Sequence, residues 1–96
     1  MQVYINGSYT DHSRAVIPVD DRGFLFADGV YEVIRVYNGR PFLLEPHMQR
    51  LYAGLDALRI SHRGVDVIGD VAQKLIDDNG VTGDGTVYVQ VTRGCA

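Results

Sequence analysis

Three side chains that alternate along one apolar segment could together bind a carboxylate. Residues 29–37 read GVYEVIRVY, in which Tyr31, Val33 and Arg35 are spaced two positions apart. Side chains at this spacing share one face of a β-strand. A tyrosine hydroxyl and a guanidinium can both donate hydrogen bonds to a carboxylate, and the valine would form an apolar wall between them. Strands at sheet edges often carry the same mixture without a ligand, so the pattern alone leaves both interpretations open.

Arg50 is a second candidate binding residue. It lies at the border of an apolar stripe with helical spacing, formed by Met48, Leu51, Leu55 and their neighbours. A border arginine can hold a buried anion through two parallel hydrogen bonds. The alternative is an ordinary surface arginine whose aliphatic stem covers the apolar stripe.

Other site chemistry is not indicated by the sequence. His12, His47 and His62 lack the spacing of metal ligands, and we predict no metal site. There is no phosphate-binding glycine loop before a helix and no GxSxG nucleophile motif. Lys74 is the only lysine among nine basic residues, and Cys95 is the only cysteine. A single cysteine is typical of a reducing compartment, so we expect a cytoplasmic protein.

The composition predicts a small globular domain. The chain has 96 residues, of which 46% are hydrophobic and 22% charged, and a formal net charge of −3. This size allows one domain with a modest core. The negative charge disfavours nucleic acid as a partner, because binding DNA or RNA requires a basic surface. No apolar run approaches the roughly 20 residues of a membrane-spanning helix.

The first half of the chain reads as β-hairpins separated by an irregular segment. Asn-Gly pairs at 6–7 and 38–39 predict tight turns, the second between a strand at 29–37 and a return strand at 40–44. Between the hairpins, residues 11–29 carry turn-forming residues, and we expect Phe24, Leu25 and Phe26 to anchor this segment to the core.

The second half reads as two helices followed by a strand. Apolar spacing predicts a helix from Pro46 to about Arg59 and another around 68–76, with Asp66 as a candidate N-cap. Residues 86–92 alternate and are rich in valine, which favours a central strand. This order predicts an α+β fold, with an antiparallel sheet and two helices packed on one face.

Three segments resemble a known enzyme family. DRGFLFADGVYEVIRVYNG at 21–39, HMQRLYA at 47–53 and YVQVTRG at 88–94 resemble the N-terminal domain of class IV, or fold-type IV, pyridoxal-phosphate (PLP) aminotransferases. The resemblance covers essentially the whole chain and is strongest to the D-amino-acid (D-alanine) aminotransferases. The first segment is specific to the family, whereas the HxxRL pattern is shared more widely among its relatives.

The resemblance implies roles for four residues. Arg50 matches the arginine that binds the cofactor phosphate. Tyr31 matches a tyrosine that helps to hold the substrate carboxylate, and Val33 and Arg35 match neighbours in the same pocket. The usual D-amino-acid pattern has lysine at position 35. Arg35 keeps the positive charge, but the shape of its charged group differs from that of lysine. Glu32 faces the other side of the strand, and we assign it no role.

The resemblance also implies what these 96 residues lack. In the family, the lysine that forms the Schiff base with PLP belongs to a larger C-terminal domain. Lys74 lies outside every family motif, and we expect it on the surface. Residues 1–96 are therefore expected to be a single small N-terminal domain without the C-terminal domain, with no catalytic residue and no activity alone.

The sequence leaves alternative functions open. The first expectation is an aminotransferase acting between a D-amino acid and a 2-oxo acid, as a homodimer with no nucleic-acid or membrane partner. The alternatives are a branched-chain amino acid aminotransferase, an aminodeoxychorismate lyase, or a non-catalytic α+β module. The Tyr-Glu-Val triplet at 31–33 is unusual for the lyase, which places that alternative lower.

Overall fold

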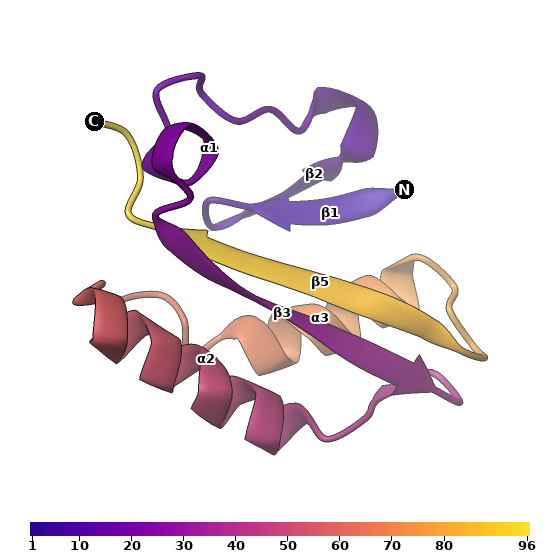
Figure 1. The fold of residues 1–96 in the computed structure, drawn as a ribbon. Coiled ribbons are helices and arrows are strands. Elements are labelled where there is room, and N and C mark those ends of the chain that lie inside the picture. The colour runs from indigo at the N-terminus through magenta and orange to yellow at the C-terminus, as the bar shows by residue number, and fades with distance from the viewer.

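The structure, a computed structural model, describes all 96 residues as an α+β fold (Figure 1). Two antiparallel sheets and three α-helices form the fold, together with a 3-10 turn at His12–Arg14. The strands are β1 Gln2–Ile5, β2 Ser8–Asp11, β3 Gly29–Tyr37, β4 Arg40–Pro41 and β5 Gly85–Thr92. The helices are α1 Arg22–Phe26, α2 Leu44–Leu58 and α3 Ile68–Asp78.

The strands pair in two separate groups. β1 and β2 form a hairpin, and β4, β3 and β5 form a three-stranded sheet in that order. Both Asn-Gly turns are confirmed: Asn6, Gly7, Asn38 and Gly39 all have positive φ. Two consecutive positive φ values define the type of turn whose twist matches that of a hairpin.

The core lies between the three-stranded sheet and the helices. Ile34 and Val36 of β3 are fully buried, as are Leu51 and Leu55 of α2. Figure 1 shows α2 and α3 on the same side of this sheet. The predicted arrangement of two helices on one face is therefore confirmed.

Several local predictions were wrong. β5 pairs only with β3 and is an edge strand of this chain, although its valines suggested a central position. The return strand is only two residues long, because Leu43 has a positive φ that turns the chain into α2 at Leu44. The N-cap of α3 is Val67, not Asp66, and no side chain caps it.

The apolar residues 24–26 do not anchor to the core. Phe24, Leu25 and Phe26 form most of α1, and Phe24 is 74% exposed. A five-residue helix at the end of the sheet has no second layer of this chain to cover its outer surface. Apolar side chains exposed together in this way are typical of an interface.

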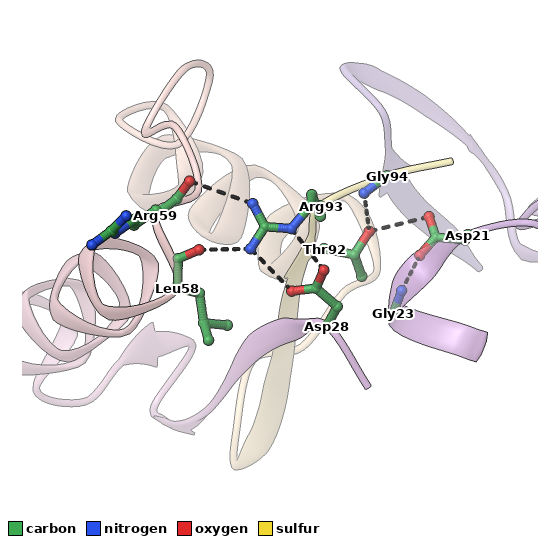
Figure 2. Close-up of polar contacts among 8 residues, drawn as sticks. All are labelled: Asp21, Gly23, Asp28, Leu58, Arg59, Thr92, Arg93 and Gly94. Atoms are coloured by element: carbon green, nitrogen blue, oxygen red, sulfur yellow. Dashed lines mark hydrogen bonds and ion pairs between the residues drawn. The ribbon is translucent and has the colours of Figure 1, made fainter. Parts of the chain in front are cut away.

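Arg93 joins the ends of three elements (Figure 2). Its guanidinium donates to both carboxylate oxygens of Asp28, at 2.7 and 3.2 Å, and to the carbonyl oxygen of Leu58 at 2.6 Å. The bond from Arg93 lowers the pKa of Asp28. Arg93 thus ties the end of β5 to the start of β3 and to the carbonyl end of α2, where a cation is favoured.

The Asp-Arg-Gly segment before α1 is bound to the same end of the sheet. The carboxylate of Asp21 accepts hydrogen bonds from the backbone N–H of Gly23 at 2.8 Å and from the hydroxyl of Thr92 at 3.1 Å. Figure 2 shows this contact beside the Arg93 cluster. The motif residues at 21–23 and 92–94 therefore have a structural role in holding β5 against α1.

Candidate functional site

A buried carboxylate connects β3 to α2 beside Arg50, one of the predicted binding residues. Glu32 points to the helix side of β3 and is 6% exposed. It accepts a hydrogen bond from Arg50 Nε at 3.0 Å and lies 2.6 Å from Nδ1 of His47. His47 and Arg50 are three residues apart on α2 and therefore share one side of that helix.

The partners of Glu32 keep its carboxylate ionised. Burial works to raise the pKa of Glu32, but the hydrogen bonds from His47 and Arg50 and their charges outweigh it, so the pKa is lowered from 4.5. A buried carboxylate would be costly without these partners. The sequence contained the signal for this role, because Glu32 lies on the same face of the strand as the apolar side chains of Val30, Ile34 and Val36. An acid among such residues must be paired.

Arg50 is held at one nitrogen and open at the other two. Its Nε is bound to Glu32, whereas its terminal nitrogens make no hydrogen bond in the chain, and its side chain is 74% exposed. The hydrogen bond to Glu32 raises the pKa of Arg50, and Tyr31 adds a weaker electrostatic contribution. The result is a permanently charged fork, fixed at its base and directed to solvent. This donor arrangement fits a phosphate group.

The other three predicted residues lie on the opposite face of β3. The alternation is confirmed: Tyr31, Val33 and Arg35 are exposed, and the residues between them are buried. Tyr31 stacks on Tyr88 of β5, with ring centroids 5.8 Å apart and planes 20° apart. The face is therefore ordered by aromatic packing across the two strands.

Arg35 also has a local aromatic neighbour. Its guanidinium carbon lies 5.3 Å from the centroid of the Tyr37 ring, within the range of a cation–π contact. It has no carboxylate partner in the chain. The structure thus places Arg50 beside Glu32 on the helix side of β3 and the Tyr31, Val33 and Arg35 group on the other side.

A family model for amino-transferase class IV matches residues 29–96. The chain belongs to the class IV aminotransferase family. Two curated relatives are the D-alanine aminotransferases of Staphylococcus aureus (strain N315) and Listeria monocytogenes serotype 1/2a (strain 10403S). The first is 34% identical over 96 residues and the second 37% over 95 residues. The match covers 99% and 98% of this chain but only 34% and 32% of those relatives. The chain therefore spans about a third of the length of these aminotransferases.

Solved structures agree with this assignment of the fold. A hypothetical aminotransferase from Mycobacterium tuberculosis in its PLP-bound form superposes with a TM-score of 0.84 at 20% identity, over 95% of this chain and 33% of that one. The 4-amino-4-deoxychorismate lyase of Pseudomonas aeruginosa superposes with a TM-score of 0.67 at 35% identity, over 85% of this chain and 29% of that one. The expected N-terminal fold of fold-type IV enzymes is therefore confirmed.

No helix of this chain is long and apolar enough to cross a membrane. The described residues also contain no cluster of three or more potential metal-ligating side chains.

Proposed function

We propose that residues 1–96 are the small N-terminal domain of a PLP-dependent aminotransferase that transfers an amino group between a D-amino acid, such as D-alanine, and a 2-oxo acid. The observation that carries this proposal is the 34–38% identity to D-alanine aminotransferases across almost the entire chain. The geometry of Arg50 and of the exposed face of β3 supports it.

Arg50 would hold the phosphate of PLP. Its two terminal nitrogens can each donate to a phosphate oxygen while Glu32 fixes the base of the guanidinium. PLP, when bound, supplies the electron sink that stabilises negative charge on the substrate carbon. The contribution of this chain is binding and orientation.

The outer face of β3 would contact the amino-acid substrate. Tyr31 and Arg35 present a hydroxyl and a guanidinium, both of which can donate to a carboxylate, with Val33 between them. The stack on Tyr88 limits the rotation of the Tyr31 ring, which favours one direction for its hydroxyl.

We propose that the lysine required for catalysis lies outside these 96 residues. Lys74 is 52% exposed and forms an ion pair with Asp78 at 2.7 Å, so it is a surface residue and does not serve as the lysine that binds the cofactor.

The exposed side chains of Phe24, Leu25 and Phe26 support burial against a further domain or a partner subunit, consistent with a homodimer. We also propose a cytoplasmic location, since Cys95 is a free thiol.

The test uses the full-length protein loaded with PLP. Adding D-alanine should change the visible absorbance of the bound cofactor, and a 2-oxo acid should restore it. A response to L-leucine with none to any D-amino acid would contradict the D-amino-acid assignment and indicate a branched-chain enzyme.

A second candidate is aminodeoxychorismate lyase activity. The 35% identity to the Pseudomonas aeruginosa lyase is the observation that favours it. A lyase releases pyruvate from aminodeoxychorismate without an amino acceptor. Pyruvate formation from that substrate, measured without any added 2-oxo acid, would support the lyase over the aminotransferase.

A further inference from the structure

The exposed face of β3 continues onto β5. The register of the two strands places three exposed side chains of β5 directly across from the predicted substrate group of β3: Gln90 from Tyr31, Tyr88 from Val33 and Thr86 from Arg35. Directly opposed side chains of an antiparallel pair have Cβ atoms about 4.5–5.5 Å apart. The surface around Tyr31 is therefore built by β5 as well as by β3.

Tyr88 and Gln90 are joined at the tips of their side chains. The hydroxyl of Tyr88 donates a hydrogen bond to Oε1 of Gln90 at 3.0 Å. The ring of Tyr88 also stacks on the ring of Tyr31, which lies diagonally across the two strands. Tyr88 is thus held by Tyr31 at its ring and by Gln90 at its hydroxyl.

The bond to Tyr88 leaves the amide nitrogen of Gln90 free. A glutamine amide consists of an acceptor oxygen and a nitrogen that carries two N–H groups. The oxygen is bound to Tyr88, and the nitrogen makes no hydrogen bond within the chain. Gln90 therefore presents an oriented donor on an exposed face, directly across the strands from Tyr31.

Stability of the fold does not account for this arrangement. Tyr31 is 62% exposed and Tyr88 is 60% exposed, so their stack covers none of the core. The bond between Tyr88 and Gln90 is also exposed, where water competes for the same groups and the net contribution to stability is small. Large aromatic side chains that are exposed side by side are typical of a binding surface.

The charge of this face fits an anionic ligand. The outward-facing residues of β3 and β5 include no acidic side chain, and Arg35 is the only charged residue among them. A carboxylate that approaches this face therefore meets a positive charge and no negative one.

We propose that Gln90 is a further substrate-binding residue, whose amide nitrogen donates to the substrate carboxylate beside the hydroxyl of Tyr31. A carboxylate accepts hydrogen bonds at both of its oxygens, so one donor from β3 and one from β5 can bind it together. Tyr88 is the positioning residue, because its hydroxyl orients the amide of Gln90. This assignment rests on the proposed function, since it takes the carboxylate of an amino acid or a 2-oxo acid as the ligand.

Kinetics of the full-length protein loaded with PLP test the role of Gln90. Gln90→Glu keeps an acceptor for Tyr88 and removes the donor, so it separates substrate binding from a structural role. We expect the KM for D-alanine to rise about 10- to 100-fold, and kcat to stay unchanged because the carboxylate is bound equally throughout the reaction. Gln2→Glu is the matched control on an exposed residue of β1, and it should change neither constant. An unchanged KM in Gln90→Glu would overturn the proposal.

Two further variants separate hydrogen bonding from charge repulsion. Gln90→Leu removes the donor without adding a charge, and it should also raise the KM about 10-fold or more. Tyr88→Phe keeps the stack on Tyr31 but releases the amide of Gln90, and it should raise the KM by about 2- to 10-fold. In the Gln90→Leu background, Tyr88→Phe should have no effect, because its role acts through Gln90. A normal KM in Gln90→Leu would overturn the donor role, and an equal effect of Tyr88→Phe in both backgrounds would overturn the positioning role.

Nuclear magnetic resonance of isotope-labelled glutamine side chains gives a readout without turnover. The full-length protein loaded with PLP is titrated with pyruvate, which cannot be aminated in the absence of an amino donor. The side-chain amide protons of Gln90 should shift to saturation, and those of Gln2 should not move. No shift at Gln90, in an enzyme that transaminates D-alanine, would reject this assignment alone. A saturating shift at Gln90, in a protein whose cofactor does not respond to any amino acid, would support the carboxylate site and reject the proposed function alone.

Discussion

Glu32 on β3 and Arg50 on α2 are joined by a 3.0 Å hydrogen bond between a buried carboxylate and an exposed guanidinium. The bond fixes Nε of Arg50 and leaves its two terminal nitrogens open to solvent. His47 completes the arrangement at 2.6 Å from the other carboxylate oxygen. Glu32, for which the sequence predicted no role, thus positions Arg50, the proposed ligand of the PLP phosphate.

Replacing Glu32 by Gln should destabilise the chain. The amide cannot accept hydrogen bonds from both His47 and Arg50 as strongly as the carboxylate, and the site is buried. We expect a loss of about 1–3 kcal/mol in the free energy of unfolding, measured by urea denaturation. Asp84→Asn is the control, because Asp84 is exposed and makes no hydrogen bond, and it should change stability by less than about 0.5 kcal/mol.

The same pair predicts a pH dependence. The folded pKa of Glu32 is below 4.5, so the unfolded chain takes up this proton first as the pH falls. The stabilisation from Glu32 is therefore complete above about pH 5 and is lost as the pH falls through the folded pKa. The wild type should lose more stability than Glu32→Gln between about pH 5 and pH 3. Parallel curves would contradict the assignment, because Asp11 and Asp28 titrate in both proteins.

Replacing Arg50 should weaken PLP binding in the full-length protein. Arg50→Lys keeps the charge but loses the planar fork, and Arg50→Ala loses both. Since a hydrogen bond to a charged group is worth about 1.5–3 kcal/mol, we expect a Kd increase of roughly 10- to 100-fold for Arg50→Ala. Gln49→Ala, which alters an exposed neighbour on α2, should leave the Kd unchanged. An equal Kd for wild type and Arg50→Ala would reject Arg50 as the phosphate ligand.

Gly29→Ala should be strongly destabilising for its size. A Cβ at this position would lie 2.7 Å from the carbonyl oxygen of Val91 and 3.1 Å from Cα of Thr92, so the backbone of β5 would have to move. We expect a loss of about 1–3 kcal/mol. Gly83→Ala is the matched control, because a Cβ there would have no neighbour within 4 Å. Similar Tm values for the two variants would show that β3 and β5 can separate at this point without cost.

The 96-residue chain should not transaminate, even with excess PLP. The hydrogen bond to Asp78 raises the pKa of Lys74, which keeps its amine protonated and a poor nucleophile. Borohydride reduction followed by mass spectrometry should therefore show no PLP adduct on Lys74, and the same sample should show no transamination. Lys74→Arg is the control for labelling at the N-terminal amine. Turnover that disappears in Lys74→Arg would refute the prediction.

Local sequence patterns predicted much of the fold. The Asn-Gly pairs gave both hairpin turns because few other residues adopt two consecutive positive φ values. The helical spacing of Met48, Leu51 and Leu55 located α2, and those side chains are buried. The N-cap of α3 was wrong because Val67 begins the helix without a side-chain cap, so packing of its apolar face stabilises it instead.

The alternation in residues 29–37 determined that this protein has a strand with two chemically different faces. It could not decide which face is covered, since each carries both apolar and polar side chains. Only the packing of α2 decided this, because it buries Glu32 with Ile34 and Val36 and leaves Tyr31 and Arg35 exposed.

The position of β5 at the edge of the sheet was also decided by the tertiary structure. Its valines favour burial, but whether a strand is central depends on which segments lie beside it in space.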